Sequence, residues 1–302
     1  MDGASKVTLS RLANLLENAR GIIQSLADQQ RTRNAALFLG GIAFLIGLIL
    51  ALKSEPHLVQ DINWIPASLV LALGVPLTML ANSLEFKLSG ASMQRRIPLR
   101  RALEISIIAS AANLLPLPGG LATRVAALKS HGIAYRDGIA VNFLFMFLWV
   151  ALAFSLAGGF IWAHEIWLAS LFLGVGLLFG GASYIWAQRR NVPLAIYGMA
   201  SLQRLAILLI ETLRIWLCLL ALDIEAGLGQ AAVFVVGGVV GSAASLVPAG
   251  LGIREGVSAG LAPFIGLSAS AGFLATALNR VIGMLFLAPV AIGISLAQHK
   301  RQ

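Results

Sequence analysis

The sequence contains Ser110-Ala-Ala-Asn-Leu-Leu-Pro-Leu-Pro-Gly-Gly-Leu-Ala-Thr-Arg124 and nearly repeats it as Ser242-Ala-Ala-Ser-Leu-Val-Pro-Ala-Gly-Leu-Gly-Ile-Arg254. Only Pro116-Leu117 interrupts the correspondence. Three long apolar stretches separate the two copies. Because three is an odd number, two copies that each re-enter the membrane would do so from opposite faces. This layout is typical of inverted-repeat transporters, in which broken elements meet near the bilayer midplane.

The chain is too apolar to fold as a water-soluble globule. Of its 302 residues, 58% are hydrophobic and 12% are charged, and the mean hydropathy is +0.86. This composition predicts an all-α polytopic membrane protein. The polar, basic segment 1–34 has no apolar core beside a small-residue cleavage site, so we expect no removable signal peptide.

Six apolar runs are long enough to span a hydrocarbon core of about 30 Å. They cover approximately 35–52, 65–84, 138–162, 166–187, 202–222 and 269–297. Two shorter runs, 102–117 and 231–247, each end at a Pro-Gly turn and are followed by a return arm, 124–134 or 254–267. We therefore predict six transmembrane helices and two re-entrant helical hairpins, arranged as inverted repeats over about 65–162 and 202–297. The hairpin turns must be buried in protein or line a cavity, because exposed irregular backbone is not tolerated in lipid.

Basic residues fall on one side of this topology. They are Lys6, Arg11, Arg20, Arg31, Arg33, Lys87, Arg95, Arg96, Arg100, Arg101, Arg124, Lys129, Arg136, Arg189, Arg190, Arg204, Lys300 and Arg301. The opposite loops hold one basic residue, Lys53, and several acids. By the positive-inside rule, both termini are expected in the cytoplasm, and the first hairpin enters from that side.

The chain divides into a cytoplasmic segment, 1–34, and a single membrane domain, 35–302. Within the first segment, leucine, alanine and isoleucine recur every three or four residues between Leu9 and Leu26. This spacing favours an amphipathic helix on the inner leaflet. A solvated tail or a helix packed on a partner protein is the alternative, because an apolar stripe alone does not identify what covers it.

The two Pro-Gly turns expose backbone N–H groups at the start of a helical arm, where the helix dipole favours an anion such as a lipid phosphate. The alternative is that proline and glycine only form the sharp reversal and allow close helix packing. Each turn is followed by an arginine, Arg124 or Arg254. An ionisable residue at membrane depth suggests a functional role.

Charged residues also occur within the fifth and sixth predicted spans. Glu211 and Arg214 are three residues apart, so they could neutralise each other on one helix face. Arg280 has no acid within a turn of its own helix, and Glu255 in the second hairpin is its expected partner. The candidate substrate-binding residues are Pro118, Gly119, Gly120, Arg124, Glu211, Arg214, Pro248, Gly250, Gly252, Arg254, Glu255 and Arg280. Gly237 and Gly241 are expected to allow close helix packing, and Asn113, Asn142 and Asn279 to bond between helices.

These motifs resemble the flippase-like membrane proteins that share the transmembrane region of lysylphosphatidylglycerol synthases. The resemblance covers about 65–297, and its most specific parts are Pro248-Ala-Gly-Leu-Gly-Ile-Arg-Glu255 and Asn279-Arg280. The first copy departs from the family pattern at Thr123, where a glutamate is common, and at Asn142-Phe143, which replaces a Glu-Arg pair. No soluble aminoacyl-transfer domain is present, so the resemblance implies lipid translocation or a related membrane role.

The leading functional hypothesis is a lipid translocator of the bacterial inner membrane that moves an anionic or zwitterionic head group between leaflets. A non-transporting lipid-binding protein that assists a cell-envelope enzyme is the alternative. An intramembrane enzyme is less favoured, since the sequence shows no paired carboxylates, Ser/His pair or metal cluster at depth. Cys218 is the only cysteine in the sequence, so no disulfide within the chain is possible, and the four histidines are too scattered to predict a zinc site. Membrane lipids and such an enzyme are the expected partners; nucleic acid, metal and cofactor are not expected.

Overall fold

A computed structural model of the chain describes residues 38–60, 62–112, 119–243 and 250–299. Every regular element in these ranges is a helix. The predicted amphipathic segment and the turn residues Asn113, Pro118 and Pro248 lie outside the described residues. All other candidate residues lie within them.

The first half of the described chain begins with an apolar helix, Phe38–Ser54. It continues through α2 (His57–Gln60), α3 (Trp64–Leu69), the π-helix η1 (Val70–Gly74), α4 (Val75–Ser92), α5 (Leu99–Ala112), α6 (Gly119–Ser130) and α7 (Tyr135–Ile161). The second half contains α8 (Ile166–Arg189), α9 (Leu194–Ala221), α10 (Leu228–Ala243), α11 (Ile253–Leu261), the 3-10 helix η3 (Ala262–Ile265) and α12 (Ala269–His299). Elements α3, η1 and α4 form one continuous helical run.

Four helical segments are long and apolar enough to cross a membrane. They are Trp64–Ser92, Tyr135–Ile161, Ile166–Arg189 and Ala269–Val290. The protein is therefore a multi-pass membrane protein, and these four helices correspond to four of the six predicted spans. The helix Phe38–Ser54 is shorter, and α9 is 28 residues long but carries three charged side chains.

Two helix boundaries differ from the sequence prediction, and both differences bring charge into the helical bundle. The second span extends beyond residue 84 to Ser92, so it includes Glu85. The fifth span begins at Leu194, directly after Pro193, and not at 202. Arg204, which the charge pattern assigns to the cytoplasmic end of the fifth span, therefore lies well inside α9 and is 7% exposed. The predicted second span ends too early because Glu85 interrupts its apolar run, whereas the predicted fifth span begins too late but already contains Arg204.

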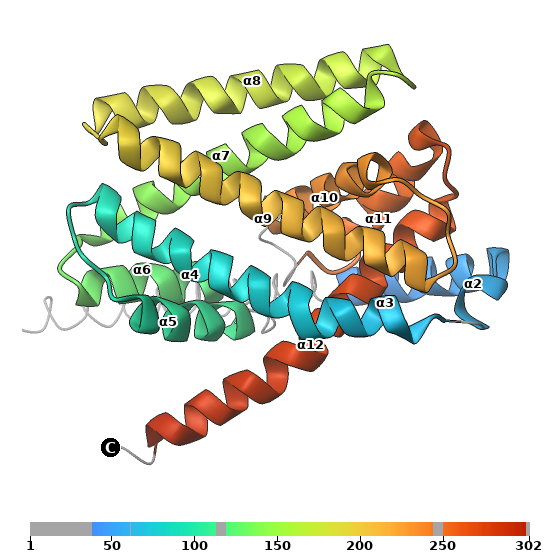
Figure 1. Cartoon of the computed structure of the whole chain (residues 1–302), viewed down its shortest axis with the longest axis horizontal. Helices are drawn as coiled ribbons and strands as arrows, with labels where there is room; N and C mark the ends of the chain where they lie inside the picture. The colour runs from blue at the N-terminus through green and yellow to red at the C-terminus, as the bar shows by residue number, and fades with distance from the viewer. Residues whose placement is uncertain (1–37, 61, 113–118, 244–249, 300–302) are drawn as a thin grey trace, which may run out of the picture.

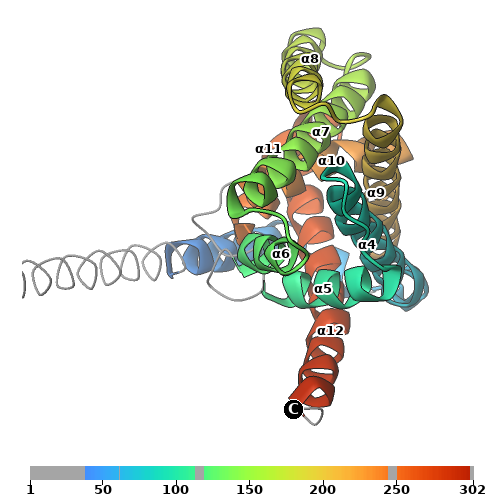
Figure 2. The same cartoon turned by 90° about the vertical axis from the view of Figure 1, so that its left-hand side faces the viewer.

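The two predicted hairpins correspond to two pairs of short helices. Helix α5 packs against α6, and α10 packs against α11. In Figure 1, α5 and α6 lie toward the end of the molecule where α4 ends and α9 begins, whereas α10 and α11 lie toward the end where α9 finishes. The pairs therefore occupy opposite ends of the long helices, with α8 on the outside of the bundle (Figure 2).

The buried core is divided between these two ends. The larger apolar cluster surrounds α10, where Val233 and Phe234 are fully buried, and draws residues from α7, α9 and α12. The smaller cluster joins α4, α5, α6 and α7 around Leu128, Leu144 and Phe145. Each hairpin is thus packed into its own core, and α9 passes from one core to the other (Figure 1).

Candidate functional site

The second hairpin enters α11 through two glycines in left-handed conformations. Gly250 has φ +62° and Gly252 has φ +79°, a region that residues with a side chain rarely adopt. A Cβ at Gly250 would also lie 2.5 Å from the carbonyl oxygen of Gly241 in α10. The turn therefore requires glycine both for its backbone angles and for its contact with α10.

Glu255 closes the start of α11. Its Oε2 accepts a hydrogen bond of 3.0 Å from the Gly252 N–H, so a protein carboxylate already occupies part of the helix N-terminus at which an anion was expected. The Glu255 residue is fully buried. A buried carboxylate at this position needs a cation, because burial of an unpaired charge is costly.

Arg280 of α12 supplies that cation. Its Nε lies 3.0 Å from Glu255 Oε1, and its Nη2 donates a 3.2 Å hydrogen bond to the Gly250 carbonyl oxygen. The pair expected from the sequence is confirmed. Arg280 thus holds both the glycine turn and the acid of the second hairpin, and we call Glu255 and Arg280 the second-half cluster.

Arg254 lies between α11 and the glycines of α10. A Cβ at Gly241 would be 3.1 Å from Arg254 Cβ, and one at Gly238 would be 3.5 Å from its guanidinium carbon. Among the described residues, its Nε has no hydrogen-bond partner. Gly237 contacts α11 in the same way, so the packing role predicted for Gly237 and Gly241 is confirmed.

The first half contains a different cluster, formed by Glu85, Arg124 and Arg204. Glu85 Oε1 lies 2.7 Å from Arg124 Nη1 of α6 and 2.8 Å from Arg204 Nη2 of α9. Glu85 is 3% exposed. One carboxylate therefore joins the first hairpin to α4 and α9, and we call these three residues the first-half cluster.

Aromatic rings and unsatisfied polar atoms surround Arg204. Its guanidinium carbon lies 5.3 Å from the ring centre of Phe145 and 5.8 Å from that of Trp149, within the range of cation–π attraction. Within the described part of the chain, Glu85 Oε2, Arg204 Nε, Trp149 Nε1 and Gln203 Oε1 are buried without hydrogen-bond partners. Each such group costs about 1–3 kcal/mol when left unpaired, so this position favours a polar ligand or water.

Arg214 links α9 to the π-helix. Its Nη1 donates a 3.0 Å hydrogen bond to Thr78 Oγ1. A Cβ at Gly74, the last residue of η1, would lie 2.6 Å from Arg214 Cγ, so this glycine makes room for the arginine. π-helical turns of this kind are frequent at functional sites.

Glu211 and Arg214 do not form the direct ion pair considered from their spacing. Among the described residues Arg214 bonds to Thr78, and Glu211 Oε2 is buried without a hydrogen-bond partner. The two still interact electrostatically, as do Arg204 with Glu211 and Arg254 with both Arg214 and Arg280. The amide of Asn142 bonds within its own helix, to the Gly138 carbonyl at 2.7 Å, and not between helices.

These contacts define a row of charges that runs along α9 from the first hairpin to the second. We call it the charge row; its members are Arg124, Glu85, Arg204, Glu211, Arg214, Arg254, Glu255 and Arg280. Five arginines and three glutamates leave an excess of two positive charges. The sequence candidates Gly119 and Gly120 form the first turn of α6, and Gly250 and Gly252 lie beside the second-half cluster.

Glu85, Arg204 and Thr78 were missed by sequence reasoning. The signal available for Arg204 was its spacing of seven residues from Glu211, which places both on one helix face. Glu85 followed an apolar run directly, and a longer helix would have included it. No sequence signal identified Thr78, because a threonine within an apolar helix is ordinary.

Residues 194–291 match the family model described as the lysylphosphatidylglycerol synthase TM region. The match begins with α9 and ends within α12, so it contains Glu211, Arg214 and the whole second-half cluster but neither Glu85 nor Arg124. The resemblance inferred from the sequence is confirmed over these residues. Comparison with curated proteins and with solved structures gives no match.

Proposed function

We propose that this protein is a flippase-like lipid translocator, which moves an anionic or zwitterionic lipid head group between the two leaflets. The observation that carries the proposal is the charge row, an excess of positive charge buried in a multi-pass membrane protein. Buried ionisable residues in membrane helices are costly and usually mark a path for a polar substrate. The family match over α9 to α12 supports a lipid-related role.

A head-group phosphate would bind by competing with the protein's own carboxylates. Glu255 pairs with Arg280 and accepts a hydrogen bond from the Gly252 N–H. Glu85 pairs with both Arg124 and Arg204. In our proposal, a phosphate displaces one of these carboxylates and takes over its arginines. Arginine suits this exchange because its planar guanidinium binds carboxylate and phosphate with similar geometry.

The two hairpins suit alternating access from the two faces. Each is joined by a buried Glu–Arg contact to a helix outside the hairpin, α4 and α9 in one case and α12 in the other. We propose that they form the inverted repeat predicted from the sequence, with both termini in the cytoplasm of a bacterial cell. The location of the pairs at opposite ends of the long helices supports this arrangement (Figure 1).

Leaflet-transfer measurements test the proposal directly. The full-length protein is reconstituted into liposomes with a fluorescent anionic phospholipid, and dithionite quenching reports how much of the lipid reaches the outer leaflet. We expect wild-type protein to accelerate transfer and Arg214→Gln to slow it, whereas Lys53→Gln, an exposed charge outside the row, leaves it unchanged. If liposomes with wild-type protein transferred the lipid no faster than liposomes without protein, translocation would be contradicted.

The same charge row would also serve a non-transporting lipid-binding protein that assists a cell-envelope enzyme. In that case, wild-type protein would retain anionic lipid through purification and Arg214→Gln would release it, while transfer between leaflets stays at the protein-free rate. Neither function requires covalent chemistry from the protein. Measuring lipid retention and transfer on the same preparations therefore separates the two.

A further inference from the structure

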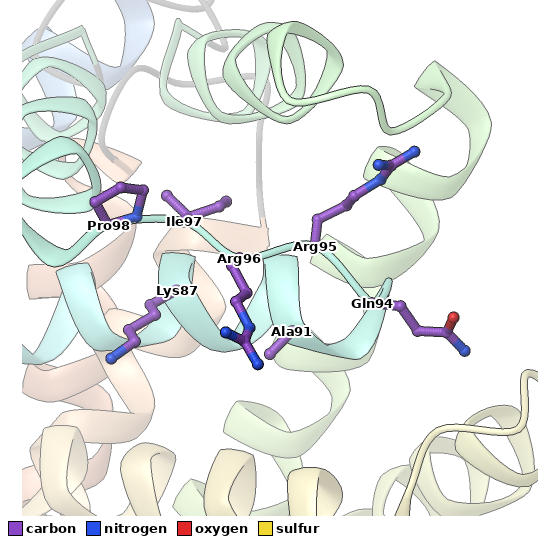
Figure 3. A pocket seen from close by; sticks show the side chains of 7 residues that line it. All are labelled: Lys87, Ala91, Gln94, Arg95, Arg96, Ile97 and Pro98. Atoms are coloured by element: carbon purple, nitrogen blue, oxygen red, sulfur yellow. The ribbon is translucent and has the colours of Figure 1, made fainter.

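A second cationic region lies outside the charge row, at the turn between α4 and α5. A pocket of about 590 Å³ is present there. It is lined by Lys87, Ala91, Gln94, Arg95, Arg96, Ile97 and Pro98, which are shown in Figure 3. Three of its side chains are basic and none is acidic.

The turn that forms the pocket is fixed by local packing. Ile97 is 2% exposed and lies where Gly90 has no side chain, 2.7 Å from the position of its absent Cβ. The Arg95 N–H donates to the Gly90 carbonyl oxygen at 2.9 Å. The turn is thus anchored to the core of the first half.

Within the described residues, the basic side chains of the pocket have no acidic partner, in contrast to their neighbours. Arg100 and Arg101 lie 3.6 and 3.0 Å from Glu104. In contrast, none of the ion pairs in the described part of the chain involves the pocket residues Lys87 and Arg96. Their charges are therefore available to an anion.

The arrangement of the side chains defines one binding side. In Figure 3, Lys87 and Arg96 project to the same side of the turn, whereas Arg95 points away from them. Arg95 lies over the turn between α6 and α7, where its guanidinium is 3.5 Å from the position of a Cβ at Gly132. An anion is therefore expected between Lys87 and Arg96, beside the apolar surface of Ala91.

The depth of the pocket identifies the source of the anion. The helical run Trp64–Ser92 has 29 residues, whereas about 20 residues cross the hydrocarbon core. The exposed basic residues Lys87, Arg95 and Arg96 gather at its C-terminal end, and this charge favours placing the last two turns in the head-group layer. Basic residues in this layer attract anionic lipid, each by roughly 1 kcal/mol, a factor of about five in affinity.

We propose that the pocket between Lys87 and Arg96 binds the phosphate of an anionic phospholipid head group. The site is separate from the charge row: Glu85, two residues before Lys87, faces the interior and pairs with Arg124 and Arg204, whereas Lys87 is exposed. The bound lipid occupies the edge of the bundle and is not the transported molecule. The proposal does not rest on lipid transfer by this protein.

Native mass spectrometry of the full-length protein in detergent tests the site, with phosphatidylglycerol and phosphatidylcholine as the two probes. Wild type should bind phosphatidylglycerol more tightly than phosphatidylcholine. Lys87→Gln/Arg96→Gln should weaken phosphatidylglycerol binding about tenfold, less than the full product of two charges because both side chains are exposed. Arg100→Gln/Arg101→Gln removes the same charge from paired residues, so it should change binding by less than about twofold.

Three results would overturn the proposal: no lipid preference in wild type, equal losses in the two double variants, or displacement of the lipid by inorganic phosphate at equal concentration. The last would assign the pocket to a soluble anion. Lys87→Arg/Arg96→Lys, which keeps both charges on similar side chains, should retain binding. If the glutamine double variant does not fold, Arg96→Gln alone should still weaken phosphatidylglycerol binding more than Arg100→Gln/Arg101→Gln does, and an equal loss would overturn the proposal.

Discussion

In both halves of the molecule a Glu–Arg contact attaches the hairpin to a long helix, but the hairpin carries the glutamate in one half and the arginine in the other. In the second half, the hairpin supplies the acid, Glu255, and α12 supplies the arginine, Arg280. In the first half, the hairpin supplies the arginine, Arg124, and α4 supplies the acid, Glu85. Each hairpin is therefore held by a buried Glu–Arg contact, but the near-repeat of the two turns does not include Glu85 or Arg280.

This exchange explains the departures of the first repeat from the second. Thr123 and Val125 flank Arg124 where the second repeat has Glu255 beside Arg254, and Phe143 follows Asn142 where Arg280 follows Asn279. With no local acid, Arg124 uses Glu85, which also binds Arg204. The family match over residues 194–291 alone agrees with this difference.

The largest effect is expected from Arg280→Ala. It leaves the fully buried Glu255 without its cation and the Gly250 carbonyl without a donor, and breaking a buried pair costs about 3–5 kcal/mol. Thermal unfolding of the purified protein in detergent should show a large drop in the midpoint.

The control for Arg280→Ala is Glu255→Gln/Arg280→Gln, which removes both charges and should be less harmful than the single change. Arg280→Lys keeps the charge but not the two-sided contact, so it should lie between wild type and Arg280→Ala. If the double variant were as unstable as Arg280→Ala, the pair would not be the source of the stability.

Gly250→Val should cause the second-largest loss of folding stability, about 3 kcal/mol. A left-handed conformation costs a residue with a side chain about 1–3 kcal/mol, and the new Cβ would also clash with backbone. The clash is with the Gly241 carbonyl at 2.5 Å. Gly256→Val is the matched control, since Gly256 lies in α11 with open space around it. Equal midpoints for the two variants would show that the turn tolerates a side chain.

Sequence reasoning predicted most of the helices because their apolar runs and Pro-Gly turns are local signals. It also predicted the Glu255–Arg280 pair, since Arg280 needed an acid and the second repeat offered one next to its turn. The first-half cluster could not be predicted in the same way. Glu85 lies just past the end of the second predicted span, Arg204 lies at the edge of the fifth, and their contact depends on how α4 and α9 pack.

Glu85→Gln should cost about 2 kcal/mol, less than Arg280→Ala, because the amide oxygen still accepts from one arginine and Arg124 is 20% exposed. The guanidinium groups of Arg124 and Arg204 then lose the carboxylate that they share. In the lipid-retention measurement, their release should increase the affinity for anionic lipid while stability falls. Glu225→Gln, which removes an exposed acid that is in none of the ion pairs of the described residues, is the control and should change neither quantity. Unchanged lipid affinity in Glu85→Gln would argue against competition between Glu85 and the head group.

The smallest effect is expected from Arg204→Lys, which tests whether the first half depends on charge alone. Lysine keeps the positive charge near Glu85 but loses the flat contact with Phe145 and Trp149, so the cost should be about 1 kcal/mol. Arg190→Lys is the matched control, because Arg190 pairs with Asp137 at 2.7 Å and lies near Trp186 but is exposed. Its midpoint should stay close to that of wild type. If both variants unfold at the wild-type temperature, the rings around Arg204 contribute only apolar packing. A drop in Arg204→Lys as large as that of Arg280→Ala would show instead that the shared carboxylate, and not the two-residue pair of the second half, is the stronger attachment.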